Sequence, residues 1–287
     1  MIVTRFAPSP TGYLHLGHAL AALTAWETAR SAEGRFLLRF EDIDRARARP
    51  EYENAIRDDL AWLGITWAEP VLRQSERFPA YRAALETLEG EGLLYPCFCT
   101  RSEVAAEIAR AGEAPHGPEG PLYPGTCRRL SEVERVGRIA EGATYALRLD
   151  NLKARARVGA LSFEEHGRGP SGETGRIAVD PLSFGDIVIA RKDTPASYHL
   201  SVVVDDASQN VTLVTRGFDL FGATRVQRVL QALLDLPCPQ YAHHRLVLGE
   251  HGRKLSKRDA AMSLRALRES GMTASGVRDM LVLRCED

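Results

Sequence analysis

Two histidines near the start of the chain and two lysines near its end have side chains suited to binding phosphate. His15 and His18 are three residues apart, so on a helix both imidazoles face the same side and can donate hydrogen bonds to phosphate oxygens. Gly17 between them lets a ligand approach the backbone closely. Lys254 and Lys257 add positive charge on a glycine-containing segment. Either pair alone would be an ordinary surface feature, but together they predict a site that stabilises negative charge on phosphates.

Three cysteines have a spacing that suits a metal ion. Cys97 and Cys99 lie close together in the sequence, and Cys127 follows in a segment rich in glycine and proline. Thiolates hold zinc in closed tetrahedral sites, which stabilise small loops that cannot bury a core of their own. Tyr123 and His116 are both candidates for the fourth ligand, and general ligand chemistry favours the histidine. The alternative is a set of three reduced cysteines without a metal.

The composition places limits on partners and compartment. The chain has 287 residues, 44% hydrophobic and 26% charged, as expected for a globular protein, and its net charge of −1 restricts any nucleic-acid contact to local patches. Candidate patches are Arg45, Arg47 and Arg49, and Arg128 with Arg129. The number of cysteines is odd, which favours a reducing compartment. We also find no apolar run of about 18 residues and no signal peptide. These features predict a cytoplasmic protein with no membrane contact.

Hydrophobic periodicity predicts an α/β protein with a parallel sheet. Strands at 1–6 and 35–40 alternate with helices at 15–30, 50–63 and 78–90. Further strands are expected at 143–149, 186–190, 200–204 and 211–214, and a helix at 224–236. A G-x-G-x-x-G at 167–172 contains a proline and opens no helix, so we interpret it as a loop. The expected domains are 1–94 and 177–250 as two halves of one sheet, 95–176 as an insertion, and 251–287 as a lysine loop with a helical segment.

Longer stretches around these residues resemble the class I aminoacyl-tRNA synthetases, and the glutamyl subgroup in particular. The matching stretches are 5–14 (RFAPSPTGYL), 15–18 (HLGH), 39–45 (RFEDIDR), 198–206 (YHLSVVVDD), 216–219 (RGFD) and 254–258 (KLSKR). The resemblance covers nearly the whole chain. It implies a Rossmann-like catalytic domain with a zinc-containing insertion, which activates glutamate with ATP and Mg²⁺ to form glutamyl-adenylate.

The resemblance also implies roles for individual residues. ATP would bind at His15, Gly17, His18 and Lys257, with His15, His18, Lys254 and Lys257 taking part in catalysis. Arg5 and Arg216 would bind the carboxylates of glutamate, and Glu41 its ammonium. Tyr198 would donate its hydroxyl to a carboxylate, while Phe6, Ala7, Pro8 and Ser9 line the pocket. Asp205 and Asp206 would be structural or lie near the ribose. The zinc ligands would be Cys97, Cys99, Tyr123 and Cys127.

Within this family, the sequence favours the shortened paralogues of glutamyl-tRNA synthetase. Only 29 residues follow Arg258, so we expect no anticodon-binding domain, and the Cys-x-Cys…Tyr-x-x-x-Cys set and 216–220 (RGFDL) are similar to these paralogues. They transfer glutamate to queuosine in the anticodon loop of tRNA(Asp), without needing tRNA for the activation step. The resemblance implies no protein partner. Two alternatives are a truncated glutamyl-tRNA synthetase that charges tRNA(Glu), and a non-catalytic tRNA- or nucleotide-binding relic.

Overall fold

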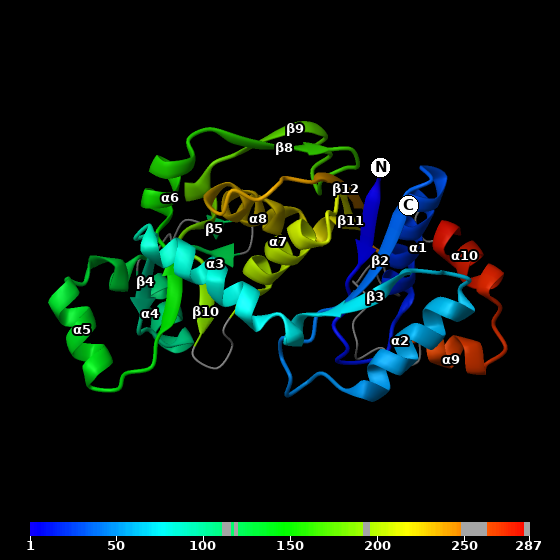
Figure 1. Cartoon of the computed structure of the whole chain (residues 1–287), viewed down its shortest axis with the longest axis horizontal. Coiled ribbons are helices and arrows are strands. Elements are labelled where there is room, and N and C mark those ends of the chain that lie inside the picture. Colours follow the sequence, from blue (N-terminus) through cyan, green and yellow to red (C-terminus); the bar gives the residue numbers. More distant parts are fainter. Residues whose placement is uncertain (111–115, 118–119, 192–195, 248–262, 284–287) are drawn as a thin grey trace.

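The N-terminal part of the chain, residues 3–73, forms a parallel sheet that has helices on both faces. The structure is a computed structural model that describes residues 1–110, 116–117, 120–191, 196–247 and 263–283. Strands β1 (Val3–Phe6), β2 (Arg35–Phe40) and β3 (Ala68–Arg73) are parallel neighbours, connected by helices α1 (Leu16–Ser31) and α2 (Pro50–Trp62). Figure 1 shows these elements at one end of the molecule, with α9 (Leu264–Glu269) and α10 (Ala274–Leu283) beside them.

Alternate residues of β2 pack into two different hydrophobic clusters. Phe36, Leu38 and Phe40 pack with α1, α2, α9 and α10, whereas Leu37 packs with α3 (Phe78–Gly90), α7 (Tyr198–Ser208) and α8 (Phe221–Leu233). Successive strand side chains point to opposite faces, so both faces of this sheet are buried. Arg39 is on the same face as Leu37 and is fully buried. A charged side chain therefore enters the core beside α7.

A second sheet adjoins the first along β1. Strands β11 (Leu213–Gly217), β12 (Gln240–His244) and β8 (Leu161–Glu165) are parallel, and β9 (Gly175–Val179) is antiparallel at the edge. The junction is held by Thr212, whose hydroxyl accepts a hydrogen bond from the Val3 N–H at 2.9 Å and whose own N–H donates to the Val3 carbonyl at 3.0 Å. The predicted α/β parallel architecture is confirmed.

The segment 200–204, expected to be a strand, is part of helix α7. Leu200 and Val203 are one helical turn apart and face the same core cluster, and the side chain of Ser197 caps the helix by accepting from the Leu200 N–H. A short apolar run fits a buried helix as well as a buried strand, so periodicity alone could not distinguish them. Asp205 and Asp206 consequently lie in the helix rather than at a strand end.

A small antiparallel sheet, which includes the strand that ends at Cys97, lies distant from β1–β3 (Figure 1). Its strand order is β10 (Val188–Arg191), β7 (Ala146–Leu149) and β4 (Leu94–Cys97). The remaining elements of the described part of the chain are β5 (His116–Gly117), β6 (Gly120–Pro121), α4 (Arg101–Arg110), α5 (Glu132–Ala140), α6 (Asn151–Val158) and the 3-10 turns Gln74–Glu76, Thr126–Arg129, Pro181–Phe184 and Phe218–Leu220. Strand β8 pairs with β12, although the sequence places it within the expected insertion. The division into 1–94, 95–176, 177–250 and 251–287 remains a prediction.

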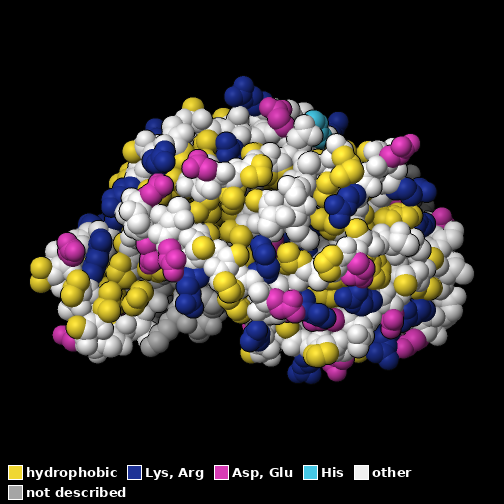
Figure 2. Space-filling model, in the orientation of Figure 1, with side chains coloured by type: hydrophobic (Ala, Val, Ile, Leu, Met, Phe, Trp, Pro, Cys, Tyr) yellow, Lys and Arg dark blue, Asp and Glu magenta, His cyan; other side chains and the backbone are white. Residues whose placement is uncertain are grey.

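The surface mixes charges of both signs. Figure 2 shows lysines and arginines interspersed with acidic residues over the visible face, in agreement with the net charge near zero. Among the described residues, no helix is both long and apolar enough to span a membrane.

Candidate active site and metal centre

A cavity of about 850 Å³ lies where the carboxyl ends of β1, β11 and β12 meet the start of α1. In open α/β sheets, ligands bind outside the carboxyl ends of the strands. The cavity brings together all the described residues expected to bind nucleotide or glutamate. Its lining includes Arg5, Phe6, Ala7, Pro8, Ser9, His15, Gly17, His18, Glu41, Tyr198 and Arg216, together with 244–247. Their functional roles remain predictions, but their convergence on one cavity is a structural fact.

The two histidines form the cap of helix α1. His15 Nδ1 accepts a hydrogen bond from the Gly17 N–H at 3.1 Å, and His18 Nδ1 accepts from the His15 N–H at 3.2 Å. Their ring centroids are 3.9 Å apart. Because both Nδ1 atoms accept backbone N–H groups, the proton of each neutral ring is on Nε2. The Gly17 N–H is therefore already used by His15, and the donors that the pair offers at this end of α1 are imidazole Nε2–H groups.

Arg5 is held by a buried acidic residue. The Asp206 carboxylate lies 3.1 Å from Arg5 Nε and 2.7 Å from Arg39 Nη1. Arg39 Nη2 in turn lies 3.6 Å from Glu41 Oε1. Burial favours the neutral acid, but the charges of Arg5 and Arg39 lower the pKa of Asp206. Asp206 therefore stays ionised and fixes Arg5, which is a structural role for this residue.

Arg216 is positioned by side chains other than carboxylates among the described residues. Its Nη2 donates to Thr224 Oγ1 at 2.6 Å and its Nε donates to His243 Nε2 at 3.2 Å. Nη1 is buried without a hydrogen-bond partner, and no ion pair joins Arg216 to an acid among the described residues. A buried guanidinium in this state requires an anionic partner. A substrate carboxylate in the cavity would supply it.

Glu41 and Tyr198 face the same cavity with shifted pKa values. Burial raises the pKa of Glu41 to about 7, although Arg39 and Arg5 oppose the shift. Burial also raises the pKa of Tyr198, so its hydroxyl keeps its proton and can donate to a carboxylate. Desolvation disfavours the carboxylate form of Glu41 until a cation offsets it. A substrate ammonium is such a cation.

A smaller cavity of about 370 Å³ adjoins the first. Ser9, Glu41 and Tyr198 line both cavities, and Asp44 and Arg47 contribute to the smaller one. There is thus room for a second substrate beside the residues expected to hold glutamate.

Lys254 and Lys257 lie outside the described residues, as does Cys285. The two lysines belong to the stretch 248–262, and the described residues that flank this stretch are at the site. Val247 lines the large cavity, and Ser263 forms a β-bridge with His15.

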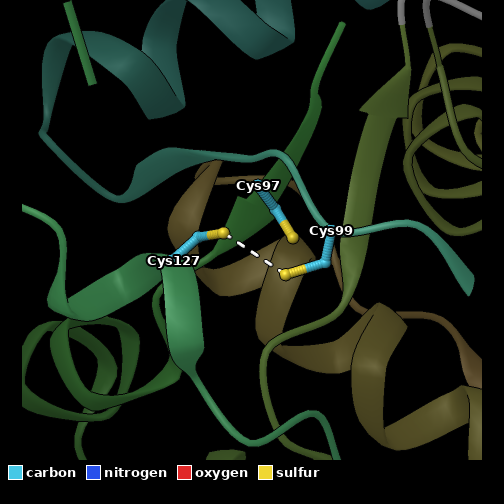
Figure 3. Close-up of side chains that lie close together, drawn as sticks. All are labelled: Cys97, Cys99 and Cys127. Atoms are coloured by element: carbon cyan, nitrogen blue, oxygen red, sulfur yellow. Dashed lines mark hydrogen bonds between the residues drawn. The ribbon is translucent and has the colours of Figure 1, made fainter. Parts of the chain in front are cut away.

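The side chains of Cys97, Cys99 and Cys127 point toward one another at the end of β4 (Figure 3). Their sulfur atoms lie within 4.8 Å of one another, and those of Cys99 and Cys127 are 3.4 Å apart. Ligand sulfurs of a tetrahedral zinc site are about 3.8 Å apart for Zn–S bonds of about 2.3 Å. The three thiols therefore fit one metal ion, and such a site could hold it with little rearrangement.

The hydroxyl of Tyr123 lies at a distance from the cysteine sulfurs that suits a fourth ligand. Its hydroxyl is 3.4 Å from the Cys97 sulfur and 3.5 Å from the Cys99 sulfur. In a tetrahedral zinc site with a Zn–O bond of about 2.0 Å and a Zn–S bond of about 2.3 Å, the oxygen and sulfur ligands lie about 3.5 Å apart. The guanidinium of Arg148 lies 3.8 Å from the Tyr123 ring centroid. The side chain of His116 lies outside the described residues.

The arginines expected to contact RNA have partners within the protein. Arg47 pairs with Asp44 at 2.6 Å, and Arg49 lies 3.7 Å from Glu51. Arg45 donates to the Ser75 carbonyl at 3.0 Å. Arg128 binds the buried Asp186 at 2.9 Å, whereas Arg129 is exposed and 3.9 Å from Glu107. Arg128 thus has a structural role, and the others keep solvent access for a phosphate.

Sequence reasoning missed residues that support the site. Arg39, Glu165, Thr224 and His243 are buried and hold the side chains that face the cavity. A signal was present for Arg39, because a charge within the apolar stretch 36–40 must have a buried partner. Glu165 and His243 are 78 residues apart, and no local pattern connects them.

The comparison with known protein families agrees with this geometry. The family described as tRNA synthetases class I (E and Q), catalytic domain, matches residues 1–285. The chain belongs to this family. Glutamyl-Q tRNA(Asp) synthetase of Rhodobacter capsulatus is 50% identical over 285 residues, covering 98% of this chain and 100% of that protein. The protein of the same name from Symbiobacterium thermophilum is 43% identical, and the match covers 96% of this chain and 84% of that protein.

Relatives with a different name match this class I synthetase over part of their length. Glutamate–tRNA ligase of Aquifex aeolicus is 42% identical, and the match covers 98% of this chain and 57% of that protein. The solved glutamate tRNA ligase of Elizabethkingia meningosepticum, in complex with its amino acid, has a TM-score of 0.74 at 29% identity and 90% coverage. The chain spans about half the length of that structure, 52%. The predicted Rossmann-like class I fold is confirmed.

Proposed function

We propose that the protein activates L-glutamate with ATP, without tRNA, and transfers it from glutamyl-adenylate to queuosine in the anticodon loop of tRNA(Asp). The observation that carries the activation step is Arg216, a buried guanidinium in the cavity without a carboxylate partner among the described residues. The choice of acceptor is supported by the name of the relative that matches 98% of this chain and 100% of its own length.

Five described side chains have a defined task in this reaction. Arg216 and Tyr198 bind a carboxylate, and Glu41 binds the ammonium, which favours its charged form. The Nε2–H groups of His15 and His18 donate to phosphate oxygens of ATP, assisted by the positive end of α1. Lys254 and Lys257 are proposed to stabilise the charge of the departing pyrophosphate. The acceptor hydroxyl then attacks the glutamyl carbonyl, and AMP leaves.

Two metals accompany this proposal. Mg²⁺ enters with ATP and neutralises phosphate charge. Zinc would be held by Cys97, Cys99, Tyr123 and Cys127 and would pin the insertion between β4 and β7 without taking part in the reaction. We place the reaction in the cytoplasm, where its substrates and reduced thiols occur together.

Glutamate-dependent exchange of pyrophosphate into ATP, measured with Mg²⁺ and no tRNA, tests the activation step. We expect exchange with glutamate and little with glutamine, because an amide leaves a buried guanidinium without an anion. Lys257→Ala should lower the exchange rate far more than it raises the KM for glutamate. Equal exchange with both amino acids would contradict the glutamate site, and no exchange would favour a non-catalytic relic.

A further inference from the structure

Three adjacent strands contribute one polar side chain each to a buried row behind the glutamate cavity. Arg216 of β11 is in register with His243 of β12, and β12 pairs in turn with β8, which ends at Glu165. All three side chains are at most 5% exposed. The row leads from the protein interior to the guanidinium that faces the cavity.

The hydrogen bonds in this row have a fixed direction. Glu165 Oε2 lies 2.6 Å from His243 Nδ1, and Oε1 accepts from the backbone N–H groups of His243 and Gly167, each at 2.8 Å. Burial would raise the pKa of Glu165, but the hydrogen bonds from His243 lower it. Glu165 is therefore a carboxylate, which can only accept. The proton of the neutral imidazole must consequently be on Nδ1.

The other ring nitrogen then has a lone pair directed at Arg216. His243 Nε2 lies 3.2 Å from Arg216 Nε, which carries a proton and can only donate. Burial, assisted by the positive charge of Arg216, lowers the pKa of His243 although Glu165 opposes the shift. A protonated ring would place an N–H against the guanidinium N–H. The arrangement is satisfied only by the neutral Nδ1–H tautomer.

The glycine-rich stretch 167–172 has a structural explanation in this arrangement. A Cβ on Gly167 would lie 2.2 Å from the His243 carbonyl oxygen and 2.7 Å from its nitrogen. Only glycine allows this backbone to approach β12 and donate its N–H to Glu165. The G-x-G-x-x-G stretch, which the sequence analysis interprets as a loop and not as a dinucleotide-binding motif, therefore helps to hold the Glu165 carboxylate in place.

We infer that Glu165 and His243 are positioning residues for glutamate recognition: they fix the imidazole tautomer that accepts from Arg216, and so orient its guanidinium toward the substrate carboxylate. The inference rests on the proposed function, in which Arg216 binds glutamate. Neither residue lines the cavity, so both act through Arg216. Thr224 completes the clamp, because its hydroxyl accepts from Arg216 Nη2 at 2.6 Å.

Glu165→Gln provides an isosteric test. The amide oxygen would remain on the two backbone N–H donors, so the amide NH₂ would face His243 Nδ1 and donate to it. The ring proton of His243 would then move to Nε2, where it would face the Nε–H group of Arg216 and remove the acceptor for that group. We expect the KM for glutamate to rise roughly tenfold or more, with the KM for ATP unchanged. Glu164→Gln, the same substitution at the exposed neighbour on β8, is the matched control and should behave as wild type.

The tautomer itself is measured in the wild-type protein by ¹⁵N–¹H NMR of labelled histidine, with His243 assigned from a His243→Gln variant. A proton on Nδ1 alone supports the inference, and a proton on Nε2 or on both nitrogens overturns it, even if Glu165→Gln does not fold. A glutamate KM within twofold of wild type in Glu165→Gln, or equal increases in both KM values, also overturns it. Absence of exchange in the wild type would instead reject the proposed function and leave the tautomer result intact.

Discussion

Asp206 and Arg5 form a buried ion pair, with 3.1 Å between the Asp206 carboxylate and Arg5 Nε, and Arg5 lines the large cavity. Arg39 completes this network at 2.7 Å from the same carboxylate. Arg216, on the neighbouring sheet, has no such acid among the described residues. The two arginines expected to bind carboxylates therefore differ: Arg5 is paired with an acid of the protein, whereas Arg216 Nη1 is buried without a hydrogen-bond partner, as the proposed glutamate site requires.

Removing the charge of Asp206 should destabilise the fold. In Asp206→Asn the guanidinium groups of Arg5 and Arg39 lose a buried anion, so the free energy of unfolding should fall by about 3 kcal/mol in urea denaturation at pH 7. The native pKa of Asp206 is lowered, so its contribution is present above the unfolded pKa of about 3.9 and is lost as the pH falls through the lower native pKa. A loss below about 0.5 kcal/mol at pH 7 would contradict this assignment.

Arg216→Gln should remove discrimination between glutamate and glutamine. Loss of a buried charge pair costs about 2–5 kcal/mol, so the affinity for glutamate should fall by about 30-fold or more, while glutamine binding changes less. Isothermal titration calorimetry with each amino acid measures both affinities. Arg155→Gln, at an exposed position of helix α6, is the matched control and should retain wild-type binding. Preserved preference for glutamate in Arg216→Gln would remove Arg216 from the recognition site.

Glutamate binding should depend on pH through Glu41. Burial raises its pKa to about 7, and only the carboxylate attracts the substrate ammonium. Binding should therefore weaken as the pH falls below about 7 and release a proton in that range, because the bound ammonium lowers the pKa again. Calorimetry without ATP, in buffers of different ionisation enthalpy, measures this proton. Glu41→Gln should bind more weakly and without the pH dependence. Proton-neutral binding at pH 6 would contradict the role of Glu41.

Metal analysis should find about one zinc per chain, lost together with local stability in Cys127→Ser. Tyr123→Phe and His116→Ala decide the fourth ligand, and we expect only the tyrosine variant to lose zinc affinity, because the Tyr123 hydroxyl lies 3.4 Å from the Cys97 sulfur. Exchange activity should persist in both variants, since the site is structural. Zinc loss in His116→Ala alone would show that general ligand preference was the better guide.

Local patterns predicted the elements that carry the phosphate and glutamate residues. The strand at 35–40 and the helix that starts beside His15 were confirmed, because the strand is a short apolar run and the helix is rich in alanine and leucine and is followed by Gly34. The helix at 198–208 was mistaken for a strand, since its apolar run is short. The pairing of β8 with β12 and the Glu165–His243 contact could not be predicted, because they depend on tertiary approach between distant segments.

Transfer of labelled glutamate to tRNA(Asp), with queuosine or with unmodified guanosine in the anticodon loop, shows whether queuosine is the acceptor. We expect label on the queuosine-containing tRNA only, and undiminished transfer to tRNA whose 3′ terminus was oxidised with periodate beforehand while its queuosine was protected. Label on the 3′ ribose of tRNA(Glu), and none on queuosine, would contradict the proposed function and identify a glutamyl-tRNA synthetase.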